Sequence, residues 1–487
     1  MEETANLVAS EEEVAEAAAD KNVPRSRVRS CFLAPVQWLR MLAVEMHWSF
    51  GFGGALSDVA TKYYMKDLQK VQPSESQVYT GIIKLPWIVK PIWGLLTDVL
   101  PVAGYRRRPY LILAGFLGVF SMLVLSFYKV HLVLALVLLT AGTAGVAIAD
   151  VIDACVAQNS ISHPSLAADM QSLCALSEST GGLVGFVISG IFVHRMGPMG
   201  VFALLTIPAG LVLLLGSILD EPHTSNFDYR QVSQKFLDAG KAMWTTLKIP
   251  AVWRPCIYMY SSIALSWNIR DGMFYWYTDA DGGPSFSEET VGYLLSIGSV
   301  GSFLGAILFQ HGLKDRPFRD LLLWTQLLFG LSGMLDLVLV LRLNLKLGVP
   351  DYFFAVTDEG VSRMIGTLQR MPLYVLSSKL CPSGIEGTFF ALLMSIDNMG
   401  VLLASWGGGL LLHTLGVTRT QFGNLWLAIL IRNILRISPL CLLFLVPGGD
   451  PNASLLPEEL LASKEGTETA EPQHIKLVSL VNSAESR

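Results

Sequence analysis

Three carboxylates fall inside stretches that are otherwise apolar enough to cross a lipid bilayer. Asp150 and Asp153 lie in TAGTAGVAIADVIDACVAQ, and Glu178 lies in MQSLCALSESTGGLVGFVISGIF. An ionisable group in hydrocarbon costs at least about 2.5–3.5 kcal/mol, so such residues usually face a hydrated cavity or a partner and mark a transport pathway. This placement favours a membrane transporter.

The spacing of Asp150 and Asp153 adds a second indication. Residues at i and i+3 project from the same side of a helix. Two carboxylates held this close in a medium of low dielectric constant cannot both ionise cheaply, so one of them is expected to bind and release a proton. The alternative is that Asp153, near the inner end of its span, is solvated and that Asp150 acts alone.

The composition of the whole chain agrees with a membrane protein. Of 487 residues, 52% are hydrophobic and only 15% are charged, whereas about 25% charge is usual in soluble domains. The mean hydropathy is +0.48. The small net charge of −5 implies no nucleic-acid partner. The six cysteines lack the spacing of a disulfide framework or a zinc site, so we expect no metal.

Twelve apolar stretches have the length of about 20 residues that a helix needs to cross the hydrocarbon. They begin near Trp38, Val78, Tyr110, His131, Ala167, Met199, Ala251, Thr290, Phe318, Tyr352, Thr388 and Gln421. A long polar stretch divides them six and six. We therefore predict an all-α polytopic membrane protein with two six-helix bundles, at 36–220 and 251–447, joined by a cytosolic linker at 221–250. The tails at 1–35 and 448–487 are expected to be disordered and cytosolic.

Basic residues predict the orientation, because Lys and Arg are enriched in short cytoplasmic segments. The N-terminal tail, the GYRRRPY loop, the linker and the KDRPFR loop all fall on one side, which places both termini in the cytosol. Lys62, Lys66 and Lys70, in the first outward loop, are exceptions. The first residues have neither the apolar core of a signal peptide nor the composition of a transit peptide. We therefore expect the plasma or vacuolar membrane rather than the plastid envelope.

A weak internal repeat supports the two bundles. At an offset of 218 residues, Ser177 corresponds to Ser395, Gly182 to Gly400 and Gly190 to Gly408. Parallel repeats are one of the ways in which transporters are built, and they place the substrate near mid-membrane between the halves.

The segment from Lys62 to Gly115 carries a long motif. It consists of Pro86, Lys90-Pro91, Gly94, Asp98 and the basic turn Gly104-Tyr105-Arg106-Arg107-Arg108. This stretch closely resembles the characteristic segment of the folate-biopterin transporter family, which belongs to the major facilitator superfamily. The resemblance implies twelve helices, alternating access, and uptake of folates or related pterins coupled to protons. It implies no cofactor, and we expect a monomer embedded in the lipid bilayer.

The same motif suggests a gate. In facilitators this loop joins spans two and three, where Gly94 would permit close helix approach. Asp98 at a helix end could pair with a cation of the turn or of a neighbouring helix, and such pairs hold one face of a transporter closed until it opens. The candidate cations are Arg106, Arg107 and Arg108. The alternative is that these arginines act only as a topology signal.

Candidate substrate contacts follow from the chemistry of a folate. Glu178 and Asp397 lie near the middle of spans five and eleven, at almost repeat-related positions. A carboxylate there can accept both adjacent N–H donors of a pterin ring, although either acid could instead lock helix packing. The anionic glutamyl tail requires a cation. Arg370 in span ten is the first candidate, opposite Asp150, and Lys90 is the second.

Other intramembrane groups have structural alternatives. Lys84 and Arg270 could extend their charges to the outer interface. Arg432 and Arg436, on a peripheral span, are expected to be structural or to contact lipid headgroups. The aromatic residues of WNIRDGMFYWYTD, from Trp267 to Asp279, could stack a heterocycle but also fit an interfacial belt.

Competing functions differ in cargo or in class. The leading hypothesis is a proton-coupled carrier of folate or a related pterin, and its alternative carries another small organic anion by the same mechanism. A polytopic membrane enzyme is considered because D-x-x-D at Asp150 to Asp153 partly resembles a metal-pyrophosphate motif. No second acidic cluster, nucleophile elbow or P-loop accompanies it. A receptor or scaffold is a further alternative.

Overall fold

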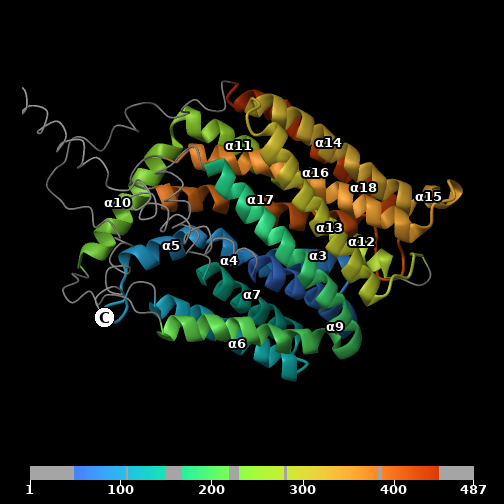
Figure 1. Cartoon of the computed structure of the whole chain (residues 1–487), viewed down its shortest axis with the longest axis horizontal. Helices are drawn as coiled ribbons and strands as arrows, with labels where there is room; N and C mark the ends of the chain where they lie inside the picture. Colours follow the sequence, from blue (N-terminus) through green and yellow to red (C-terminus); the bar gives the residue numbers. More distant parts are fainter. Residues whose placement is uncertain are drawn as a thin grey trace, which may run out of the picture.

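The structure is a computed structural model that describes residues 49–105, 108–149, 167–218, 230–278, 282–381 and 386–448. Within these ranges the chain is helical and forms no β-strand, apart from an isolated bridge between Val102 and Tyr105. Figure 1 shows the helices as one elongated bundle, with those of the N-terminal half (blue to green) below and those of the C-terminal half (yellow to red) above. The predicted all-α fold is confirmed.

The N-terminal half begins with a helix over 49–63, which continues into a π-helical turn, η2 (Tyr64–Leu68). The helices that follow are α3 (Pro73–Ile83), α4 (Leu85–Ile88), α5 (Lys90–Val99), α6 (Arg108–Phe127), α7 (Leu132–Ala149) and α9 (Ala167–Ile218). Lys62 therefore lies within a helix, where it bonds Asp58 one turn earlier at 2.7 Å, and not in the outward loop where the sequence placed it.

The C-terminal half follows α10 (Arg230–Leu247), which lies within the predicted linker. Its helices are α11 (Pro250–Ala264), α12 (Arg270–Tyr277), α13 (Glu288–Leu308), the π-helical turn η5 (Phe309–Leu313), α14 (Phe318–Val340), α15 (Leu343–Lys346), α16 (Asp351–Lys379), α17 (Glu386–Thr414), α18 (Leu425–Ile437) and the 3₁₀ helix η6 (Ser438–Leu445). From Val78 onward, every predicted span begins within five residues of a described helix start.

Seven of the described helices are long and apolar enough to cross a membrane. One of them, α9, holds two predicted spans, because the backbone turns at Gly197 with φ 70° and ψ 173°, values that favour glycine. Figure 1 shows the two parts of α9 meeting at this turn. The other predicted spans include shorter helices, which reflects the interruptions described next.

Prolines interrupt span two at mid-length. Pro86 lies in the first turn of α4 and Pro91 in the first turn of α5, and a proline cannot donate a helical hydrogen bond to the carbonyl four residues earlier. The freed backbone turns toward α17 of the other half, where Ser395 donates to the Ile88 carbonyl. The family-like Pro-Lys-Pro frame therefore builds a broken helix with Lys84 and Lys90 at its breaks.

Span seven is also interrupted, between α11 and α12. The backbone N–H of Asn268 donates to the Ala404 carbonyl of α17 at 2.9 Å. A side chain at Gly408 could not fit, because its Cβ would lie 1.7 Å from the Asn268 carbonyl oxygen. Interrupted backbone at membrane depth is tolerated where it is buried in protein or lines a hydrated cavity, and transporters commonly bind substrate at such breaks.

The two halves meet along two seams. In the first, α9 packs on α13 at Gly190 and Gly292, where a Cβ on Gly190 would lie 2.9 Å from the Gly292 Cα, and Ser296 donates to the Leu183 carbonyl at 3.0 Å. In the second, α17 packs on α3, where a Cβ on Gly409 would lie 2.8 Å from the Ser74 carbonyl oxygen. The repeat relates these seams, since spans five and eight correspond to spans eleven and two.

Candidate functional site

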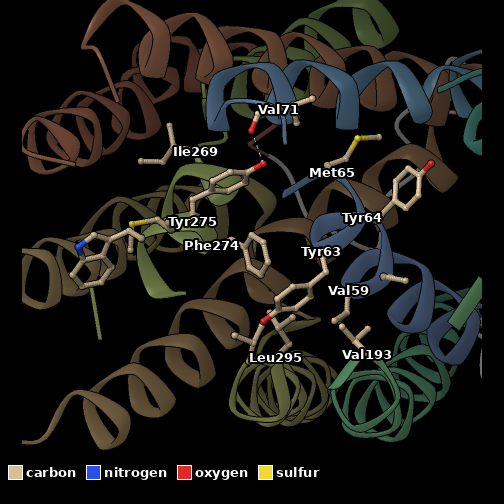
Figure 2. Packing of buried hydrophobic residues seen from close by; sticks show 14 of the residues in the cluster. Val59, Tyr63, Tyr64, Met65, Val71, Val193, Ile269, Phe274, Tyr275 and Leu295 are labelled. Carbon is tan, nitrogen blue, oxygen red and sulfur yellow. Dashed lines mark hydrogen bonds between the residues drawn. The ribbon is translucent and has the colours of Figure 1, made fainter. Parts of the chain in front are cut away.

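One end of the bundle, here called the sealed end, has an apolar core shared by both halves. Tyr63, Tyr64 and Val71 of the N-terminal half and Phe274 and Tyr275 of the C-terminal half belong to one buried cluster. Figure 2 shows the Tyr63 and Phe274 rings beside each other in an edge-to-face arrangement, with centroids 5.0 Å apart, and the Tyr275 hydroxyl donating to the Val71 carbonyl at 3.1 Å. The aromatic residues of span seven therefore pack against the other half.

A buried carboxylate, Asp271, links the two halves at the sealed end. Asp271 is only 1% exposed and accepts hydrogen bonds from Ser76 at 2.8 Å and Thr80 at 3.1 Å, both on α3. Its backbone N–H donates to the side-chain oxygen of Gln77 at 3.1 Å. Lys66 adds a bond to the Thr278 hydroxyl at 2.6 Å. These contacts join the two halves and must break if the sealed end opens.

The apolar core toward the opposite end is distributed differently. The cluster around Phe309, Phe318 and Phe389 is built from the linker and the C-terminal half, and among the described residues only Ala175 joins it from the N-terminal half. The described contacts thus hold the halves together more extensively at the sealed end.

Three exposed cations face one another between the halves. Lys84 comes from the first break of span two, Arg270 from the start of α12 and Arg370 from α16. The charges of Arg270 and Arg370 act on Lys84, and Arg370 also acts on Arg270. All three residues are exposed, and the elements that carry them belong to both halves. We call this set the cationic triad, and infer that it lines an accessible space between the halves.

Ion pairs flank the triad. Glu359 accepts from Arg363 at 2.6 Å and lies 4.0 Å from Arg270, whose side chain is 49% exposed. A Cβ on Gly298 of α13 would lie 2.8 Å from the Glu359 carboxylate, so a glycine makes room for this pair. On the other side, Asp58 and Lys62 form the pair noted above. Arg270 is thus weakly held and available to a ligand.

Three of the residues proposed from the sequence come together beside the triad. The charges of Asp397 on α17 and Glu178 on α9 both act on Arg370, and Tyr374, one turn along α16, adjoins its guanidinium group. Asp397 is buried and Glu178 is exposed. A guanidinium and two carboxylates from three helices of both halves are therefore neighbours.

Other proposed residues have different surroundings. The Lys90 ammonium lies 5.5 Å from the centre of the Trp87 ring, at the second break of span two. Arg108 donates to the Ser217 carbonyl at 2.8 Å and so anchors the end of α9. The expected close packing at Gly94 is not seen, because no described atom lies within 4 Å of an added Cβ. Its carbonyl accepts a hydrogen bond from Thr97 at 2.8 Å instead.

Several sequence proposals cannot be placed. Asp150, Asp153, Arg106 and Arg107 lie outside the described residues, as does the side chain of Asp98. The acid pair of span four and the ion pair of the proposed gate therefore remain predictions.

Sequence reasoning missed Asp58 and Glu359 and placed Lys84 and Arg270 near the outer interface. The rule that singled out Glu178 applies equally to Glu359, which lies within the tenth predicted span. Lys84 and Arg270 each stand at a helix break, and both are exposed.

Comparison with known proteins assigns the chain to a family. A model of the BT1 family matches residues 50–458. The chain belongs to this family. A plant relative in the family, "Probable folate-biopterin transporter 2" of Arabidopsis thaliana, is 60% identical over 479 residues, covering 95% of this chain and 96% of that protein. "Folate-biopterin transporter" of Synechocystis sp. is 31% identical over 416 residues, covering 85% and 83%.

Solved structures show the fold of this BT1 family member. A D-xylose-proton symporter superposes with a TM-score of 0.61 at 14% identity, covering 85% of this chain and 98% of that one. The likeness extends over both halves, which agrees with the predicted major facilitator fold. The family match and the apolar helices identify the chain as a multi-pass membrane protein, and its relatives are named as transporters.

Proposed function

We propose that this protein carries folate or a related pterin across a membrane by alternating access, driven by protons. The cationic triad is the observation that carries this proposal. Lys84, Arg270 and Arg370 repel one another across the space between the halves, and an anion bound among them would relieve that repulsion. The names of the relatives point to folates and pterins as the cargo.

The two ends of a folate match two parts of the site. Arginine binds carboxylates through parallel hydrogen bonds, so the triad suits the glutamyl tail. Glu178 and Asp397 lie beside Arg370, where a carboxylate can accept the adjacent N–H donors of the pterin ring. A biopterin lacks the carboxylates and would use the second part alone.

The shared core at the sealed end supports alternating access. The basic tail and loops predict that the sealed end faces away from the cytosol. The structure would then represent a conformation that is closed on the outer side of the membrane. Cargo that bridges the cations of both halves would favour the halves closing around it.

Uptake into proteoliposomes tests the proposal. Wild-type protein should take up labelled folic acid and biopterin, and a protonophore should abolish accumulation. Arg370→Ala should weaken folic acid uptake roughly 10- to 100-fold, the loss expected for a charge-assisted hydrogen bond, and affect biopterin much less. Arg316→Ala, an exposed arginine in a loop, is the matched control.

The competing cargo gives a different result. If another organic anion is the substrate, that anion will be taken up and folic acid will neither enter nor compete. Equal losses of folic acid and biopterin in Arg370→Ala would contradict the assignment of the glutamyl tail to the triad.

A further inference from the structure

A second group of charges lies wholly inside the C-terminal half, between α14, α16 and α18. Arg432 of α18 donates to Asp336 of α14 at 2.7 Å and to the Gly333 carbonyl at 3.2 Å. Asp358 of α16 lies beside Asp336. Arg432 and Asp358 are each 3% exposed. The Asp336 side chain is 18% exposed. We call Asp336 and Asp358 the buried acid pair, because Asp358 and the arginine bonded to Asp336 are both buried.

Asp358 lacks a hydrogen bond that its burial demands. Its Oδ1 accepts from Ser362 at 2.9 Å, but its Oδ2 is buried without any partner. The two carboxyl groups of the acid pair are within hydrogen-bonding reach of each other. Ionised carboxylates only accept hydrogen bonds. One proton on Asp358 would convert the orphan oxygen into a donor to Asp336 and satisfy both groups.

The described charged groups around Asp358 do not pair with it directly. Asp358 is faced by Glu359 on its own helix, Asp336 on α14, Tyr277 on α12 and the arginines of α18. Arg432 is already held by Asp336, and Arg436 lies over the Phe329 ring, 4.2 Å from its centre. Among the described residues, Asp336 thus has a directly bonded arginine, whereas Asp358 has none.

We propose that Asp358 is the site that carries the coupled proton, shared with Asp336 and separate from the cargo site. The inference rests on the proposed function, since it names the residue that would make that transport proton-driven. The proton adds to Oδ2 of Asp358, forming an O–H bond that points to Asp336. On release this bond breaks and the proton passes to a neighbouring acceptor.

Glu359 is the acceptor that links this site to the cargo. It is the next residue on α16, and it faces Arg363 and Arg270 beside the triad. Tyr277 of α12 lies near enough to Asp336, Asp358 and Glu359 for their charges to act on its hydroxyl group. An anion that binds Arg270 and Arg363 displaces Glu359 from its ion pairs with them. The Glu359 carboxylate then receives the proton. Tyr277 gives one proton to Glu359 and takes one from Asp358, so it is unchanged.

The test separates coupling from cargo binding in proteoliposomes with the membrane potential clamped to zero. With one proton per cargo, a gradient of one pH unit should drive about tenfold accumulation of labelled folic acid by the wild type. Asp358→Asn should lose this accumulation yet still exchange labelled for unlabelled folic acid. Asp320→Asn, an exposed acid at the start of α14, should accumulate like the wild type.

Two further measurements keep the proposal falsifiable. Tyr277→Phe removes only the relay hydroxyl, so it should slow pH-driven uptake without slowing exchange. Infrared spectroscopy of the purified protein should show the C=O band of a protonated carboxylic acid that disappears in Asp358→Asn. This readout needs no cargo, so it stands even if the wild type does not carry folic acid, a result that would defeat the proposed function alone.

Several results would overturn the inference. Normal accumulation by Asp358→Asn would show that the proton binds elsewhere. Loss of exchange together with accumulation, at normal expression and folding, would make Asp358 a cargo residue. Accumulation that follows a sodium gradient and not a pH gradient would replace the proton by a metal cation. Absence of the carboxylic acid band in the wild type would refute protonation directly.

Discussion

The cationic triad and the buried acid pair handle charge in opposite ways. Lys84, Arg270 and Arg370 come from both halves, face accessible space and repel one another. Asp336 and Asp358 come from one half, Asp358 is buried, and Asp336 is paired with the buried Arg432. Exposed like charges are tolerated in the absence of a bound anion, because water screens their repulsion. A buried charge needs a partner within the protein, because no water is there to screen it.

This difference predicts different consequences of mutation. Changes in the triad should alter transport and leave folding intact, whereas changes around the acid pair should affect stability, coupling or both. The seams and the sealed end connect the two regions, so mutations there should alter the balance between conformations. The following tests separate these effects, beginning with the largest.

Breaking the ion pair at Arg432 is expected to have the largest effect. Arg432→Leu leaves Asp336 buried without its cation, and removing one partner of a buried pair costs roughly 3–5 kcal/mol. Thermal unfolding of the detergent-solubilised protein should show a marked loss of stability. The double variant Asp336→Leu/Arg432→Leu should recover most of it, and a double variant as unstable as Arg432→Leu would contradict this explanation.

A side chain in the seam between α9 and α13 should hold the sealed end apart. The Cβ of Gly190→Ala would meet Gly292 at 2.9 Å and the Glu288 carbonyl oxygen at 2.9 Å, and overpacking costs about 1–3 kcal/mol. A cysteine introduced at Ser76 should then react faster with a soluble thiol reagent. Gly53→Ala, where no described atom lies within 4 Å of the Cβ, should leave the rate unchanged.

Neutralising Glu178 should show whether this residue binds the pterin ring or the glutamyl tail. Glu178→Gln keeps the size of the side chain but cannot accept both pterin donors, so uptake should fall by roughly tenfold, about 1.4 kcal/mol. Folic acid and biopterin should be affected alike, since both contain the pterin ring. A loss confined to folic acid would reassign Glu178 to the glutamyl tail, and unchanged uptake of both would remove it from the site.

The smallest effect is expected where α17 bonds the broken span two. Ser395→Ala removes the donor to the Ile88 carbonyl, which is worth about 0.5–1.5 kcal/mol. The uptake rate should change a few-fold with little change in the apparent affinity for folic acid. Ser332→Ala, whose hydroxyl bonds only within its own helix among the described residues, is the control. A change in affinity larger than the change in rate would place Ser395 in the cargo site.

The helices could be predicted from the sequence more completely than the site. Apolar length locates spans well, because water is absent from the hydrocarbon and the backbone must bond to itself. The same reasoning identified Glu178, Arg370 and Asp397 as candidates for the cargo site. It did not bring Lys84 and Arg270 together with Arg370, because hydropathy does not reveal which way a helix break turns its neighbours. It also passed over Asp336 and Asp358, whose importance appears only when α14, α16 and α18 meet.

The two glycine-lined seams have a mechanical consequence. A rigid body that stays attached to another at two separate places can only pivot about the line that joins them. The contacts of Gly190 with Gly292 and of Gly409 with Ser74 therefore define the axis about which one half rotates relative to the other. The glycines at both seams let the helix backbones approach closely, so the rocking motion has a single degree of freedom.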